Sequence, residues 1–179
     1  MRKTLLRLTA TVLILLALFG FERLILPPAI GIAFHRTLPE KCDSRLWQFI
    51  NPSERLKMVQ ECVTVTGVVD SKATVIAPGE HEGSYQFLLK PDPDYQDMVD
   101  GGLNVVLQHG DLVIQMVCAR PNIKSEAAAS CEGYSNSMPI PEVGQHIQVT
   151  GSFVYNPVFL GKFGWNEIHP VSDLASVAN

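Results

Sequence analysis

The sequence contains none of the short motifs that commonly mark catalysis or a bound cofactor. It has no GxSxG nucleophile turn, no HExxH zinc motif and no glycine-rich phosphate-binding loop. Its four cysteines form no CxxC pair, which argues against zinc-ribbon and thioredoxin-like sites. Evidence for function must therefore come from the expected fold and from looser groups of polar and aromatic side chains.

Basic side chains are scarce beyond Arg23. From there on the chain has 10 Lys and Arg against 17 Asp and Glu, with no basic cluster. Such a domain is a poor generic binder of phosphate backbones, so nucleic acid is not the favoured partner. The closely spaced Asp92, Asp94, Asp97 and Asp100 lack the glycine order and closing Glu of an EF-hand, and predict a solvated loop.

The chain has no long apolar run of the length that usually spans a membrane. Its uncharged stretch Leu8 to Phe21 is 14 residues long and follows Arg2, Lys3 and Arg7. A basic start before a short apolar run is typical of an export signal. Because no clear cleavage site follows, a cleaved signal peptide and an uncleaved membrane anchor both remain open. The protein is expected outside the cytoplasm: membrane-anchored and facing outward, periplasmic or secreted.

Four segments are expected along the chain. They are a signal peptide or N-terminal membrane anchor over 1–26, a linker over 27–43, a β-barrel domain over 44–174 and a flexible tail over 175–179.

The cysteines are expected to form disulfides if the chain is exported. Three pairings are possible, and we favour Cys42–Cys62 with Cys118–Cys131 because each of these bonds closes a short loop of the chain. Loops of this size stabilise a fold by about 3 kcal/mol in the chain-entropy model.

Five short strands are predicted, in a mainly β domain that begins with a broken helical segment over Ser44 to Gln60. Alternating apolar residues, or apolar residues at one parity, indicate strands over Cys62–Asp70, Ser84–Lys90, Asp111–Cys118, His146–Asn156 and Trp165–Val171. A short helix, SEAAASC, is expected between the third strand and the fourth. Gly67 and Gly151, each in a VTG triplet, predict sharp bends.

This order of elements predicts a small, closed five-stranded barrel of the oligonucleotide/oligosaccharide-binding (OB) type. Strong bends in the first and fourth strands would let so small a sheet close on itself. An immunoglobulin-like sandwich is the alternative, but it would need about seven strands and no inserted helix.

The segments CVTVTGVV, NVVLQHGDLVIQMVCARP, VGQHIQVTGSFV and GWNEIHPV resemble, in this order, a family of small exported bacterial proteins with an OB-like barrel. The resemblance covers Cys62 to Leu174, and HGDL…C and WNEIHPV are its most specific motifs. Most members have no assigned function, so the resemblance implies fold and compartment only. The long apolar loop PVFLGKFG departs from the family pattern.

Four polar side chains form a candidate site. Glu167 and His169 are two apart on one strand, as are His109 and Asp111 leading into another, and each pair shares a face. If the two strands are neighbours, the four side chains could meet and bind a divalent metal or act as an acid–base pair. A structural role in hydrogen bonding is favoured over both.

Three aromatic residues, Phe159, Phe163 and Trp165, form a candidate binding surface. In OB barrels, the face of strands two and three and the loops beside it hold extended ligands. Aromatic rings there could stack on a sugar, base or peptide, although each ring is more commonly part of the core.

The sequence thus favours a non-enzymatic binding module of the cell envelope, without a cofactor, whose ligand is a glycan, a peptide or a protein. One alternative is a divalent-metal-binding protein or metal-dependent hydrolase using His109, Asp111, Glu167 and His169. A second is a purely structural envelope module. In each case the N-terminal segment could associate with a membrane.

Overall fold

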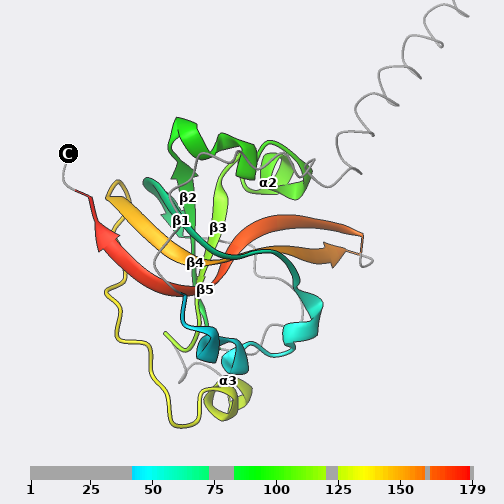
Figure 1. Ribbon diagram of the computed structural model, residues 1–179, viewed down its shortest axis with the longest axis vertical. Coiled ribbons are helices and arrows are strands. Elements are labelled where there is room, and N and C mark those ends of the chain that lie inside the picture. The colour runs from blue at the N-terminus through cyan, green and yellow to red at the C-terminus, as the bar shows by residue number, and fades with distance from the viewer. Residues whose placement is uncertain (1–41, 73–82, 120–124, 160–161, 178–179) are drawn as a thin grey trace, which may run out of the picture.

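The computed structural model describes residues 42–72, 83–119, 125–159 and 162–177, and these form a mainly β domain (Figure 1). Its sheet has five strands: β1 (Lys57–Lys72), β2 (Tyr85–Pro91), β3 (Leu112–Met116), β4 (His146–Phe159) and β5 (Phe163–Ser176). The helices are short: η1 (Ser44–Phe49), η2 (Ser53–Arg55), η3 (Pro93–Met98), α2 (Gly102–Leu107) and α3 (Ser125–Ser130).

Each strand pairs with two others, in the order β1-β2-β3-β5-β4 and back to β1. All pairs are antiparallel except β3 with β5, which run parallel with Val113 opposite Glu167. This pairing confirms the expected neighbourhood of the third and fifth strands. It also decides which side chains of those two strands lie level with one another.

The core lies inside the sheet and follows the alternation read from the sequence. Side chains of every strand meet there, together with Met98 and Val99 at the end of η3. The strand residues of this core are Val63, Val65, Val69, Tyr85, Phe87, Leu89, Leu112, Ile114, Met116, Ile147, Val149, Phe153, Ile168 and Val171. Tyr155 on β4 is half-buried and donates its hydroxyl to the carbonyl of Lys162.

Two glycines stand where strands approach too closely for a side chain. A Cβ on Gly67 would lie 2.4 Å from the carbonyl oxygen of Lys90. On Gly151 it would lie 2.5 Å from both Ile168 and the carbonyl oxygen of Pro170. The β4–β5 register also shifts on both sides of Gly151, so this position is irregular as the sequence indicated.

Some predicted boundaries were wrong. Residues Lys57 to Gln60 are strand rather than helix, because they pair with β4, with Lys57 opposite Tyr155. The helical segment is reduced to η1 and η2. Strand β5 does not end at Val171 but continues to Ser176, since Ile147 on β4 pairs with Ser176. The loop PVFLGKFG is largely strand, with Phe159 paired to Phe163.

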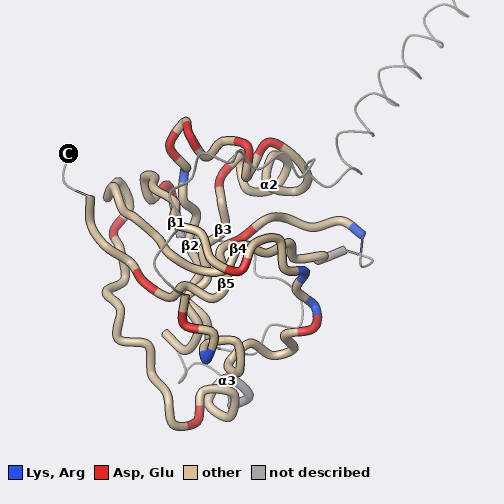
Figure 2. Tube along the Cα trace, in the orientation of Figure 1, with Lys and Arg blue, Asp and Glu red and all other residues tan. Residues whose placement is uncertain are grey.

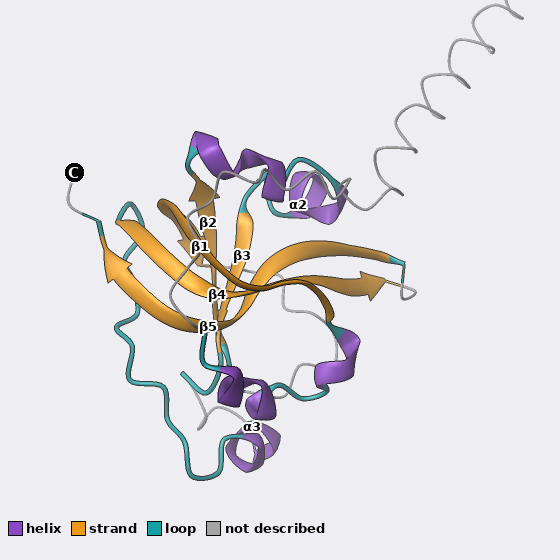
Figure 3. Ribbon diagram, in the orientation of Figure 1, coloured by secondary structure: helices purple, strands orange, loops and turns teal. Residues whose placement is uncertain are grey.

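Helices gather at two opposite ends of the strands (Figure 3). Helix α2 and its neighbours cover one part of the outer face, where Leu88, Leu103, Val113 and Trp165 form a buried cluster. Helices η1 and η2 lie at the other end, where a second outer cluster unites Leu46, Ile50, Leu56, Val117, Cys118, Cys131 and Val154.

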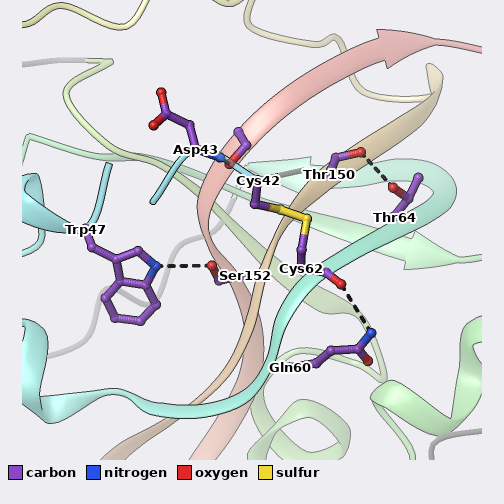
Figure 4. Close-up of a disulfide and its surroundings, with 9 residues drawn as sticks. Cys42, Asp43, Trp47, Gln60, Cys62, Thr64, Thr150 and Ser152 are labelled. Carbon is purple, nitrogen blue, oxygen red and sulfur yellow. Dashed lines mark hydrogen bonds between the residues drawn. A yellow bond between two sulfur atoms is a disulfide. The ribbon is translucent and has the colours of Figure 1, made fainter. Parts of the chain in front are cut away.

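The disulfides are Cys42–Cys62 and Cys118–Cys131, which matches the favoured pairing. Figure 4 shows the first, which joins the segment before η1 to β1. Beside it, Trp47 of η1 donates its indole N–H to Ser152 on β4 at 3.2 Å. Two disulfides indicate an oxidising environment of the kind found outside the cytoplasm.

The structure does not address the N-terminal segment, because residues 1–41 lie outside the described ranges. Within those ranges, no helix has the length and apolarity needed to cross a membrane.

Candidate functional site

The polar motif of β5 lies on the outer face of the sheet and is nevertheless sealed from solvent. Ile168 points into the core, so Trp165, Glu167 and His169 point the other way, as their parity predicted. All three are 0% exposed. The outward side chain of Val154, opposite Glu167 on β4, belongs to the cluster under η1 and η2, whereas Trp165 belongs to the cluster under α2. The motif therefore lies between two apolar clusters.

Glu167 is the centre of this motif. Its Oε2 accepts hydrogen bonds from Trp165 Nε1 at 2.7 Å and from Asn156 Nδ2 at 3.2 Å. Its Oε1 lies 3.3 Å from Asn156 Nδ2 and 3.0 Å from His169 Nδ1. With the proton on Nδ1, the imidazole ring donates to the carboxylate. Both carboxylate oxygens thus have partners, which a buried charge requires.

This arrangement suits stability better than chemistry. The nearest donors come from β4 and β5 themselves, so the carboxylate joins the two strands of one hairpin. A catalytic acid–base pair must reach a substrate proton at hydrogen-bond distance. A pair whose side chains are both 0% exposed has no such access in this conformation.

His109 and Asp111 lie apart from Glu167 and His169. Because β3 and β5 are parallel with Val113 opposite Glu167, Asp111 is level with Trp165. It is therefore four residues, about 13 Å along the strand, from the level of His169. Among the residues that the structure describes, no three His, Cys, Asp or Glu side chains group as metal ligands. The expectation that these four residues meet was wrong.

The two residues before β3 have different surroundings. His109 is exposed and takes a left-handed backbone conformation with φ of 60° in the tight turn before Gly110. Asp111 is 4% exposed, and its burial, reinforced by the negative charge of Asp70, raises its pKa to about 6. The positive charge of Lys90 and the ring of His109 act in the opposite direction.

The aromatic surface predicted from the sequence is not formed as expected. Trp165 is fully buried and uses its N–H on Glu167, so it cannot stack on a ligand. Phe163 is half-buried against the cluster under α2. The side chain of Phe159 lies outside the described part of the structure.

The outer face of β2 and β3, where OB barrels hold extended ligands, is also covered. Leu88 on β2 and Val113 on β3 are 4% and 0% exposed, and both pack with Leu103 of α2. The covering helix is α2, which was not predicted from the sequence.

Two asparagines belong to the site although the sequence did not single them out. Asn156 is opposite Trp165 across the β4–β5 hairpin, next to Glu167. Asn104 of α2 accepts from Asn166 N–H at 2.6 Å and donates to the carbonyl of Asn166 at 3.0 Å. It therefore pairs with β5 as a neighbouring strand would. A polar residue facing a buried Trp across a hairpin was a usable signal for Asn156, but nothing local marks Asn104.

Comparison with known proteins adds no assignment: no protein-family model matches the chain, and a search of curated proteins finds no match.

Proposed function

We propose that this protein is a non-catalytic binding module of an extracytoplasmic compartment, built on a closed OB-like barrel. Its ligand is a glycan, a peptide or a protein, and proteins and peptides fit the acidic surface best. It resembles the small exported bacterial proteins that share its HGDL…C and WNEIHPV motifs.

The fold part of the proposal is supported by the cyclic strand order and by α3, which lies between β3 and β4. Five strands in this order, with a helix between the third and fourth, are the arrangement of OB barrels. The close strand approaches at Gly67 and Gly151 provide the curvature that closure needs.

The compartment is supported by the two disulfides and by the N-terminal sequence. Disulfides persist outside the cytoplasm, and the basic start before an uncharged run has the pattern of an export signal or anchor.

One observation argues against an enzymatic role for this motif: the Glu167–His169 pair is sealed and its carboxylate is fully engaged within the protein. The group that would be the best acid–base or metal candidate in the sequence is thereby used to hold the hairpin. The metal-dependent alternative has less support, because among the described residues no three His, Cys, Asp or Glu side chains group as metal ligands.

The test is the metal content of the full chain by mass spectrometry, with disulfides formed, beside its His169→Ala variant. The proposal expects no stoichiometric transition metal in either protein and a lower melting temperature in the variant. One equivalent of metal, absent from the variant, would make the polar motif a metal site and contradict the proposal.

A further inference from the structure

Helix α2 presents two apolar side chains to solvent on the side opposite the core. Val105 and Val106 are 51% and 54% exposed, whereas Leu103 and Asn104 of the same helix are buried. The helix sequence, GLNVVL, has no charged residue. β-Branched residues are poor helix formers, so helix propensity does not explain two adjacent valines at exposed positions.

Acidic residues lie between β2 and this helix along the chain. Asp94 and Asp97 lie on η3 and Asp100 lies between η3 and α2, while Asp94 and Asp100 are exposed. No Lys or Arg occurs between Lys90 and Arg120. Figure 2 shows several acidic positions in the segments at the end of the molecule that carries α2. We call Asp94, Asp97, Asp100, Val105 and Val106 the η3–α2 surface.

The surface lies on a firmly packed base. Met98 and Val99, which join η3 to α2, are 1% and 2% exposed and belong to the core. Asn104 ties the helix to β5 through the backbone of Asn166. The backbone that carries the η3–α2 surface is therefore held in place before a partner binds, which reduces the ordering cost of association.

From this geometry we infer that the η3–α2 surface docks a protein segment whose apolar side chains are flanked by Lys or Arg. The valines offer the apolar contact, and the aspartates select the basic flank by charge complementarity. This inference rests on the proposed binding function and names the class of its partner.

Other occupants fit the charges less well. A second copy of this chain on a twofold axis would bring the same aspartates together, and like charges across an interface cost several kcal/mol. An anionic membrane surface and a nucleic acid backbone would be repelled for the same reason.

The test is calorimetric titration of the full chain with a short synthetic peptide in which pairs of Leu alternate with pairs of Lys. A peptide with Glu in place of each Lys is the comparison. We expect binding of the Lys peptide only, weakened by added salt. Equal binding of both peptides, or binding of neither, would overturn the inference.

Two sets of variants locate the binding. Each set should lower the affinity for the Lys peptide by about tenfold or more. One is the double variant Val105→Ser/Val106→Ser, and the other is the triple variant Asp94→Asn/Asp97→Asn/Asp100→Asn.

The matched control is Ile140→Ser/Val143→Ser, which changes two exposed apolar residues, 44% and 59% exposed, outside η3 and α2. This control variant should bind the Lys peptide with the same affinity as the unchanged chain. A control that loses as much affinity as the surface variants would overturn the inference. Metal content measured on the same preparation tests the proposed function separately, so the two failures are distinguishable.

Discussion

Glu167 is a fully buried carboxylate, and its removal should destabilise the fold strongly. Glu167→Ala leaves the indole N–H of Trp165 and the amide of Asn156 without their acceptor. A buried donor deprived of its partner costs about 1–3 kcal/mol. We expect the free energy of unfolding to fall by about 2–4 kcal/mol in urea titrations, without loss of any bound metal.

Glu167→Gln is the matched control for this prediction. It keeps one carbonyl acceptor and nearly the same volume, so its loss should be smaller than that of Glu167→Ala. Equal stability of the alanine variant and the unchanged chain would show that the carboxylate does not hold the hairpin.

Asp111 should make stability depend on pH. Its pKa is raised to about 6 from the usual 3.8, chiefly by burial. Below pH 4 the carboxyl is protonated in both the folded and unfolded states and no penalty arises. Between about pH 4 and pH 6 the unfolded chain ionises this carboxyl while the folded state keeps its proton, so about 1–3 kcal/mol of stability is lost across that window and no more above it.

Asp111→Asn removes this titration, so its stability relative to the unchanged chain should rise between pH 4 and pH 7. Urea titrations at several pH values measure the difference. Asp173→Asn, at an exposed position on β5, is the control for loss of one negative charge. A constant difference between Asp111→Asn and the unchanged chain would contradict the raised pKa.

At the residue scale, the parity of side chains was predictable and their burial was not. Alternation correctly placed Glu167 and His169 on one face, and Ile168 between them points into the core. The sequence could not show that this outer face is covered, because the cover comes from α2 and from η1, which lie far away along the chain. Trp165 was therefore kept as a candidate for a ligand surface, although it is buried.

At the scale of elements, Asn104 attaches α2 to the sheet. Its side chain makes three hydrogen bonds, to the N–H and carbonyl of Asn166 and to the carbonyl of Asp111. Asn104→Ala removes all three and leaves buried backbone groups without partners. We expect the free energy of unfolding to fall by about 2–4 kcal/mol and hydrogen exchange of the backbone amides near Asn166 to accelerate.

The control for this prediction is Val105→Ala on the same helix. Val105 is 51% exposed, so its truncation should change stability by less than about 0.5 kcal/mol. If both variants behave alike, the asparagine does not anchor the helix.

Elements with a clear period were easier to predict than those without one. The strands β2 and β3 were predicted within one or two residues because apolar residues alternate through them. The segments Lys57–Gln60 and Leu103–Gln108 were not, since each takes its structure from contacts with distant strands. Pairing with β4 makes the first a strand despite its helical pattern.

At the scale of the whole molecule, the sequence predicts the excess of acidic residues, whereas the fold decides where those residues lie. The excess of acidic residues was visible in the sequence, but where η3 and α2 lie on the molecule depends on the chain path from β2 to β3. The order β1-β2-β3-β5-β4 brings the parallel pair β3–β5 together and sets Asp111 level with Trp165. The sequence pattern identified the two polar residues on each strand, but it could not give the register between β3 and β5.

The disulfides should be needed for the stability of the whole domain. Their cysteines are 20 and 13 residues apart, and closing loops of this length contributes about 3 kcal/mol each in the chain-entropy model. Domains of this size are stable by about 5–15 kcal/mol in total. Reduction should therefore remove a large share of the stability and lower the urea midpoint markedly.

The paired variants Cys42→Ser/Cys62→Ser and Cys118→Ser/Cys131→Ser separate the two contributions. The first releases the segment before η1, whereas the second opens a disulfide inside the outer cluster that η1 covers. Each should lower the midpoint, and reductant should have little further effect on a chain carrying both changes. If the reduced chain unfolds at the same urea concentration as the oxidised one, the fold has no need of an oxidising compartment, and the disulfides lose their weight as evidence for export.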